Sequence, residues 1–428
     1  MRIHELYLKN FRGFADREFR FHERLTLIVG ENGSGKTSLL EGLCVALGGW
    51  LYGFDGLEGT DKRNFTKADR RKTVSTINNA LLEQIPVSVG CRATLPSGIE
   101  CTWNRSLTSI KGRTTYGGLT EPRKIAESYN SRIYAGKDED IILPIVAYYS
   151  TARLWNEPIQ WEPIFTRDRV RLDGYDRAIS GSNSINNAMR FADRLAFLAY
   201  HDGDGDAIAK MNSIINAIKI SLESASPDVH VYYDRKLAEF CIRDTNGKIT
   251  PYSLFSDGYR FVTCLIIDIC HRIMTLNPHL SETAIERTGG IILIDEIELH
   301  LHPRWQQHVI DDLIRIFPAL QFIITTHTPS VVQSVKNESL MILDGDNAYY
   351  PSQSVYGRDV NSILAFIMGA KTRPEEIESM FSYIYRQIDA GELELAAQKT
   401  EVLEQILGET DPELTGIKVT LDLESLEM

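Results

Sequence analysis

Four runs dominated by apolar residues interrupt an otherwise mixed sequence of apolar and polar positions. They cover residues 25–29, 141–149, 291–294 and 320–326, and each is followed directly by a glycine or a polar residue. Apolar runs of this length, without polar alternation, are typical of strands covered on both faces of a parallel sheet. The pattern predicts an α/β fold whose core strands come from both halves of the chain.

Apolar residues at helical spacing predict helices in the middle of the chain. Residues 208–222 and 261–274 follow this spacing, and a further candidate is marked by Met189, Phe191, Leu195, Phe197 and Leu198. Strands are predicted around residues 87–101, at 229–242 and at 248–252.

The end of the chain is predicted to be helical as well. After residue 361 the pattern indicates two or three amphipathic helices, with Pro374 in a first helical turn and a break at Asp411–Pro412. Together these elements predict a first lobe (1–150), a helical insertion (151–227), a second lobe (228–346) and an acidic helical region (347–428).

Composition restricts the class of protein. A chain of 428 residues with 43% hydrophobic residues can bury a substantial core. No apolar span is long enough to cross a membrane, and the N-terminus lacks a basic-then-apolar leader. The six cysteines are scattered without a Cys-x-x-Cys pair, which predicts a reduced cytoplasmic protein.

Charge is unevenly distributed along the chain. The formal net charge is −12, and the residues from Lys371 onward hold 14 acids and 5 bases, a balance of −9. Basic residues cluster at Lys62–Lys72 and at Arg167, Arg169 and Arg171. Either cluster could contact a phosphate backbone, although scattered surface charge is the commoner explanation, so direct nucleic-acid binding stays open.

A complete phosphate-binding loop follows the first apolar run. The sequence Gly-Glu-Asn-Gly-Ser-Gly-Lys-Thr at 30–37 lies between a predicted strand and a helix-like segment, the context that this motif requires. Lys36 is expected to reach the β- and γ-phosphates, and Thr37 to ligate Mg²⁺. The nucleotide-binding residues predicted here are Gly30, Asn32, Gly33, Ser34, Gly35, Lys36, Thr37 and Ser38.

Candidate catalytic residues follow the two later apolar runs. Asp295 and Glu296 come directly after 291–294, where open α/β sheets place their ligands. Asp295 is expected to hold Mg²⁺, and Glu296 to act as the general base for the attacking water. His327 follows 320–326, and a neutral imidazole there could hydrogen-bond the γ-phosphate or the water.

A Ser-Asp-Gly sequence at 256–258 opens the predicted helix 261–274. Alone, Ser256 and Gly258 are most simply a helix cap. Loop, Ser-x-Gly, Asp-Glu and histidine in this order, however, resemble the ATP-binding-cassette (ABC) ATPases. The Glu-Leu-His-Leu-His-Pro sequence at 298–303 is similar to the segment after the Asp-Glu pair in the RecF, SMC and OLD branch.

This resemblance implies a P-loop ABC-type ATPase head with a mixed sheet, a short helical insertion and a C-terminal helical tail. In that family Ser256 and Gly258 of one subunit would close over the γ-phosphate held by another, which implies a homodimer or higher homo-oligomer around ATP and Mg²⁺. Residues 6–14 resemble the opening strand and turn of the branch, so Arg12 is expected close to the phosphates.

The sequence after residue 356 narrows the resemblance. Tyr-Gly-Arg-Asp-Val-Asn-Ser-Ile-Leu at 356–364, followed by Arg-Pro-Glu-Glu-Ile, resembles bacterial ATPases of the Septu type, which also occur beside retrons and act in anti-phage defence. Members usually regulate a separate HNH nuclease subunit. Only about a hundred residues follow His327, without a recognisable Toprim-like acidic cluster, so no nuclease activity of the chain itself is expected.

Two other functions remain open from the sequence. A RecF/SMC-like ATPase of DNA repair or chromosome maintenance would carry the same core motifs and bind duplex DNA directly. The ATPase subunit of a transporter would share the loop and the Asp-Glu strand, but the Phe-Arg-Gly-Phe turn at 11–14 argues against it.

Overall fold

The computed structural model describes residues 1–57, 61–75, 79–96, 98–151, 171–181, 185–224, 228–345 and 347–427. The chain divides into two compact units, Met1–Arg358 and Asp359–Met428. Each unit has its own secondary structure and core, and each is described separately below.

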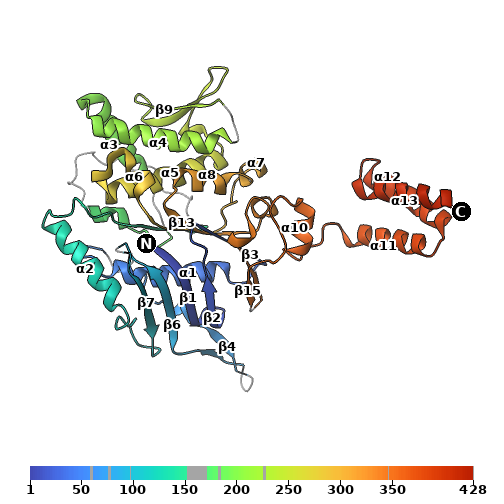
Figure 1. Ribbon diagram of the computed structural model, residues 1–428, viewed down its shortest axis with the longest axis horizontal. Coiled ribbons are helices and arrows are strands. Elements are labelled where there is room, and N and C mark those ends of the chain that lie inside the picture. The colour runs from blue at the N-terminus through green and yellow to red at the C-terminus, as the bar shows by residue number, and fades with distance from the viewer. Residues whose placement is uncertain are drawn as a thin grey trace. The chain divides into compact units, whose positions relative to one another are not determined.

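A six-stranded sheet forms the centre of the first unit (Figure 1). Its order is β15-β14-β3-β13-β12-β8, and all neighbours are parallel except β14 and β15. The strands are β3 (Leu25–Gly30), β8 (Ile145–Tyr149), β12 (Gly290–Ile294), β13 (Leu320–Thr326), β14 (Leu340–Asp344) and β15 (Asn347–Tyr349).

Every residue of β3, β8, β12 and β13 is buried. The prediction of strands covered on both faces is therefore confirmed, because continuous apolar runs suit positions without a solvent-facing side.

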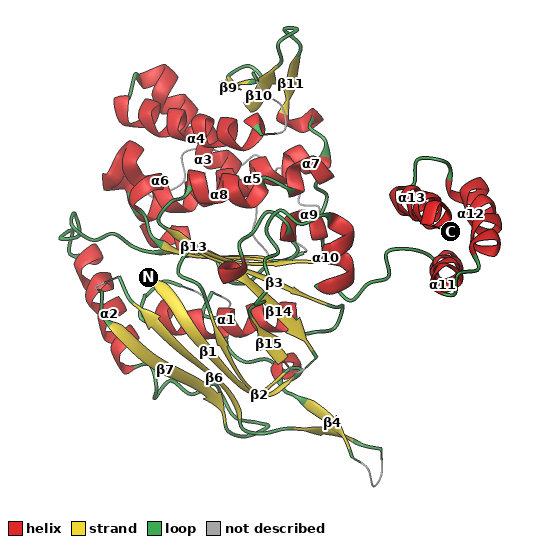
Figure 2. Ribbon diagram, turned by 45° about the vertical axis from the view of Figure 1, so that its right-hand side comes forward, coloured by secondary structure: helices red, strands yellow, loops and turns green. Residues whose placement is uncertain are grey.

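A four-stranded antiparallel sheet lies beneath the central sheet (Figure 2). Its order is β2-β1-β6-β7, with strands β1 (Arg2–Phe11), β2 (Phe14–Arg20), β6 (Val87–Thr94) and β7 (Glu100–Leu107). Helix α1 (Lys36–Leu51) contacts both sheets and is buried along most of its length. Helix α2 (Thr120–Tyr134) packs on α1 and β7, and a short hairpin, β4 (Lys72–Val74) with β5 (Leu81–Glu83), extends from this lobe.

Helices cover the other face of the central sheet. The main ones are α3 (Ile185–Phe197), α4 (Gly205–Glu223), α5 (Asp257–Leu276), α6 (Ala284–Arg287) and α8 (Val309–Ile316), with the short α7 (Pro303–Gln306) and α9 (Pro329–Val332). Helices predicted at 208–222 and 261–274 are confirmed within α4 and α5.

A small three-stranded sheet lies beyond these helices, formed by β9 (His230–Asp234), β10 (Glu239–Arg243) and β11 (Ile249–Pro251). The prediction of one strand across 229–242 was wrong. Asp234 accepts hydrogen bonds from the backbone N–H groups of Lys236 and Leu237, and this turn reverses the chain into a hairpin.

The second unit is helical and holds α10 (Val360–Phe366), α11 (Glu375–Asp389), α12 (Leu393–Leu407) and α13 (Pro412–Glu427). These are four helices, more than the two or three predicted. A small core joins α11, α12 and α13 around Phe381, Ile384, Leu403, Leu414 and Ile417. Pro374 is the N-cap of α11 and not a residue of its first turn.

Two expectations from composition can be compared with this fold. The six cysteines form no disulfide, and five of them are buried. Among the helices of the described residues, none is long and apolar enough to cross a membrane.

Candidate nucleotide-binding site

The carboxyl ends of four parallel strands meet at one edge of the central sheet. The registers place Ile294 beside Tyr149 and Ile324, and Thr326 beside Val29. The residues that follow these strands therefore share one edge. The phosphate loop, Asp295, Glu296 and His327 all come from this edge, which is where open α/β sheets bind ligands.

The loop from Gly30 to Gly35 connects β3 directly to α1. Gly33 and Gly35 have φ angles of 86° and 98°, a backbone region that favours glycine. A side chain on Gly30 would collide with the backbone oxygen of Leu343, and one on Gly35 would meet the ring of Phe14. Helix α1 begins without a side-chain cap, so its N-terminus is available to an anion.

Lys36 is folded across this loop. Its Nζ donates hydrogen bonds to the backbone oxygens of Gly30 at 2.7 Å and Glu31 at 2.8 Å, and only 5% of the residue is exposed. Burial lowers the pKa of the Lys36 ammonium, partly opposed by the charges of Asp295 and Glu296. An anion in the loop would give the Lys36 ammonium a fully charged partner in place of two carbonyl oxygens, and this would offset the cost of its burial.

Thr37 and Asp295, which are 258 positions apart, are in direct contact. Thr37 Oγ1 donates to Asp295 Oδ2 at 2.8 Å, and Thr325 Oγ1 donates to Asp295 Oδ1 at 2.6 Å. The backbone N–H of Asp295 donates to the oxygen of Tyr149 at 2.9 Å. The Thr37 hydroxyl and the Asp295 carboxylate are oxygen ligands of the kind that Mg²⁺ prefers, so this pair fits the ion.

Glu296 lies beside Asp295 in an unusual backbone conformation, with φ of 50°. Its backbone N–H donates to Thr325 Oγ1 at 2.8 Å. The Glu296 carboxylate lies 3.9 Å from Nε2 of His327, whose backbone N–H donates to Oε1 of Glu298 at 2.5 Å. The two predicted catalytic side chains are thus brought together, and both remain partly accessible to solvent.

Ser256 and Gly258 lie at the start of α5. Ser256 is the N-cap and is exposed, whereas Gly258 approaches the backbone oxygen of His300 so closely that a side chain would lie only 3.0 Å from it. The rings of Tyr259 and Trp305 pack together at an angle of 59° with their centroids 4.5 Å apart, which fixes the start of α5 against α7. Within the described residues, no hydrogen bond joins Ser256 or Gly258 to the phosphate loop.

Arg12 lies in the turn between β1 and β2 with φ of 49°. Its Nε donates to Asp69 Oδ1 at 3.1 Å, and its guanidinium lies 3.6 Å from Glu41 Oε2. Arg63 pairs with the same two carboxylates at 2.9 and 2.7 Å. These ion pairs fasten the 61–71 segment to α1, and a phosphate contact by Arg12 stays a prediction.

Sequence reasoning missed several residues of this region. Thr325 bridges Asp295 and the backbone of Glu296, but a threonine inside a strand gives no signal before the register is known. Tyr149 donates to Asp268 Oδ2 on α5 at 2.8 Å, and Arg272 donates to the same oxygen at 2.8 Å. This buried trio connects the strand beside Asp295 to the helix that begins at Ser256. The apolar run 141–149 is followed by a polar segment, and residues 152–170 of the chain lie outside the described residues.

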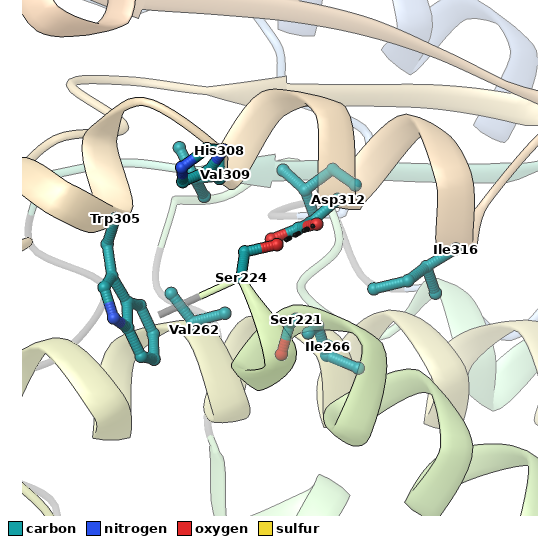
Figure 3. Close-up of a pocket in the computed structure, with 10 residues that line it drawn as sticks. Ser221, Ser224, Val262, Ile266, Trp305, His308, Val309, Asp312 and Ile316 are labelled. Atoms are coloured by element: carbon teal, nitrogen blue, oxygen red, sulfur yellow. Dashed lines mark hydrogen bonds between the residues drawn. The ribbon is translucent and has the colours of Figure 1, made fainter. Parts of the chain in front are cut away.

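A small pocket between α4, α5 and the α7–α8 segment is separate from this edge (Figure 3). Trp305 and Val262 form one side of it, and Ser224 Oγ donates to Asp312 Oδ1 at 3.0 Å on the other. Burial raises the pKa of the Asp312 carboxyl. None of its lining residues belongs to the phosphate loop or the Asp295–His327 group.

Comparisons with known proteins fit this geometry. Residues 5–225 match the family model described as AAA domain. Residues 127–333 match a second AAA domain model, whose description also names the AbiEii toxin and a Type IV TA system.

Curated relatives match most of the chain. The Retron Vc95 probable ATPase of Vibrio cholerae is 23% identical over 86% of this chain and 79% of its own length. The Retron Ec83 probable ATPase of Escherichia coli is 23% identical over 99% of this chain and 87% of its own length. The Septu protein PtuA of Bacillus mycoides is 30% identical over 80% of this chain and 40% of its own length.

Proposed function

We propose that this chain, which belongs to the AAA domain family, is an ATPase that closes as a dimer around ATP and controls a partner effector in anti-phage defence. ATP is converted to ADP and phosphate at the carboxyl edge of the central sheet. Two relatives over most of the chain bear the name probable ATPase, which supports the reaction.

One observation carries the ATPase assignment. Thr37 and Asp295 are hydrogen-bonded at 2.8 Å although they lie 258 positions apart in the sequence. A glycine-rich turn without a nucleotide role would have no need of a buried carboxylate beside its helix N-terminus, since burying a charge is costly. The pair supplies two oxygen ligands at the position where a Mg²⁺ ion would meet the phosphates.

The other residues take roles that follow from their positions. When bound, Mg²⁺ neutralises charge on the phosphate oxygens. Lys36 exchanges its two carbonyl partners for phosphate oxygens. Glu296 accepts the proton of the attacking water, and Nε2 of His327 lies 3.9 Å from the Glu296 carboxylate. Thr325 holds Asp295 and Glu296 at a fixed separation by bonding to both.

Dimerisation follows from the half of the site that one chain leaves open. Ser256 is exposed at the N-terminus of a 20-residue helix and is not bonded to the phosphate loop. A helix N-terminus attracts anions, so Ser256 and Gly258 suit the γ-phosphate held by a second copy. Two copies placed head to tail would enclose two ATP molecules. Binding closes the pair and hydrolysis reopens it.

The effector is proposed to be a separate HNH nuclease. Retron and Septu proteins are the named relatives that cover most of this chain, which supports a role in defence. In this role the ATP-bound and ATP-free states hold two states of the nuclease, and nucleic-acid cleavage belongs to the partner.

A Glu296→Gln variant tests the ATPase and the dimer together. The neutral side chain keeps its size but cannot accept the proton, so ATP binding is retained while turnover falls about 100-fold or more. The variant should accumulate as a closed dimer with ATP, measured by light scattering after size exclusion. Glu286→Gln, an exposed glutamate on α6, is the matched control and should hydrolyse ATP at the wild-type rate. Wild-type turnover by Glu296→Gln would show that another group is the base.

The effector is tested separately by purifying the tagged protein from its native host. Mass spectrometry of proteins that remain bound with the Glu296→Gln variant should identify a stoichiometric HNH nuclease. Recovery of DNA alone, without a nuclease, would contradict the controller role and favour a repair or chromosome ATPase.

A further inference from the structure

The hairpin of β4 and β5 projects from the end of the four-stranded sheet, where β4 is labelled in Figures 1 and 2. It belongs to residues 65–84, and a second segment, residues 108–114, follows the end of β7. Neither segment contributes to the nucleotide site. We call the surface formed by these two segments the hairpin surface.

Two hydrogen bonds join the segments into one surface. Arg70 donates from its guanidinium to the backbone oxygen of Ile110 at 2.8 Å. The backbone N–H of Phe65 donates to Thr114 Oγ1 at 3.1 Å. Residues 65–70 are therefore joined to residues 110–114 at two points.

The charge of this surface is strongly positive. Residues 65–84 and 108–114 contain two acids, Asp69 and Glu83, and six bases: Lys67, Arg70, Arg71, Lys72, Lys111 and Arg113. The net charge is +4, whereas residues 1–358 as a whole, with 41 bases and 43 acids, carry −2.

Both acids are already neutralised within the chain. Asp69 is paired with Arg12 and Arg63, and Glu83 with Arg70 at 2.6 Å. Across the described residues, the other five basic side chains make no ion pair, and all except the half-buried Arg71 are exposed. Five uncompensated cations on one projection attract a polyanion.

Exposed apolar side chains accompany these cations. Val74, Leu81, Leu82 and Ile110 are each between 49% and 66% exposed. Apolar side chains on a two-stranded ribbon can lie against the sugars and nucleobase edges of a nucleic acid. The neighbouring lysines and arginines can then contact the phosphates. Arg171, from the other basic cluster in the sequence, is different. Its guanidinium donates hydrogen bonds to Asp138 and to the backbone oxygens of Leu276 and Ile141. Arg171 is therefore occupied by contacts within the protein. Arg167 and Arg169 lie outside the described residues.

We propose that the hairpin surface binds the phosphate backbone of a nucleic acid. Phosphates in a duplex supply one negative charge per about 1.7 Å, a density that five neighbouring cations can match. The inference is independent of the proposed effector.

Fluorescence anisotropy with labelled 30-base-pair duplex DNA, single-stranded DNA and duplex RNA tests the proposal on the full chain. Lys72→Glu with Lys111→Glu removes two of the cations. Lys236→Glu with Lys248→Glu is the matched control, since both lysines are exposed on the β9–β11 sheet and the net charge falls by the same amount. Thermal melting and ATPase rates of both variants should equal those of the wild type.

The wild type and the control are expected to bind at least one of the three probes with similar affinity at 50 mM salt. The hairpin variant should bind that probe at least about tenfold more weakly, and its affinity should depend on salt with a slope smaller by about 2. The preferred probe identifies the polymer. The proposal is overturned if the wild type binds none of the probes, or if the hairpin variant binds as tightly as the control. It is also overturned if nucleic-acid affinity does not change in Lys72→Glu with Lys111→Glu, while Leu81→Ser with Leu82→Ser releases a protein that copurifies with the wild type.

Discussion

The two halves of the proposed ATP site differ in how completely one chain builds them. The phosphate-loop half is bonded within itself, with Lys36, Thr37, Asp295 and Thr325 each making a hydrogen bond to a partner from the same edge. The signature half is exposed, and Ser256 makes no bond to that edge within the described residues. One half therefore suits ligand binding by a single chain, and in the proposed dimer a second copy would complete the other.

Lys36→Ala is expected to give the largest effect, because it removes the cation of the bonded half. ATP binding and hydrolysis should both be lost, with turnover falling by about 100-fold or more. Isothermal titration with ATP and a phosphate-release assay measure the two effects. Lys336→Ala, an exposed lysine outside the site, is the control. Retained ATP affinity in Lys36→Ala would mean that the bonded half does not hold the phosphates.

Ser256→Arg should separate the two halves. A single chain should still bind ATP with wild-type affinity, whereas hydrolysis should fall about 10- to 100-fold because the γ-phosphate is no longer enclosed. Combined with Glu296→Gln, it should prevent the closed dimer. Equal loss of ATP affinity and turnover would indicate that Ser256 serves its own chain.

Thr325→Val keeps the volume of the side chain and removes its hydroxyl. Asp295 and the backbone N–H of Glu296 each lose one hydrogen bond, at a cost of about 1–3 kcal/mol for a buried group. Turnover should fall about tenfold while ATP affinity changes little, since the phosphate loop is untouched. Thr325→Ser, which restores the hydroxyl, should recover most of the activity. If it does not, the loss comes from packing in β13.

Tyr149→Phe is expected to give the smallest change. Asp268 would keep Arg272 and lose one donor, which should lower the free energy of unfolding by about 1–3 kcal/mol. Turnover in excess ATP should change less than in Thr325→Val, because the substitution acts on the link between the halves. Chemical denaturation and steady-state kinetics measure the two quantities. A loss of turnover larger than that of Thr325→Val would mean that the Tyr149–Asp268 contact matters more for hydrolysis than the hydrogen bonds of Thr325.

Local patterns predicted much of this protein. The P-loop, the buried strands at 25–29, 291–294 and 320–326, and the α/β fold class follow from residues that are adjacent in the sequence. The hairpin at Asp234–Glu239 was missed, because the choice between a strand and a hairpin depended on one side chain bonding to the backbone of its own turn. Pro374 was placed one position too far into α11.

The residues whose roles were not predicted from the sequence were missed for a different reason. Thr325, Glu298 and the Tyr149–Asp268–Arg272 trio act through the register of strands and the facing of a helix, and neither is encoded in a local pattern. Arg12 illustrates the same limit, since the two carboxylates that hold it are 29 and 57 positions away.

The order of the central sheet has a consequence for the birth of the protein on the ribosome. Strand β13 lies between β3 and β12, so it alone joins the β14–β3 side to the β12–β8 side. Residue 326 leaves the ribosome 296 residues after Gly30, which takes about 15–60 s at ordinary rates of synthesis. Until then the edge of β3 that pairs with β13 has backbone N–H and C=O groups without a strand partner. A nascent chain of this protein must therefore keep that edge shielded while it waits, and a stalled or truncated chain would expose it to aggregation.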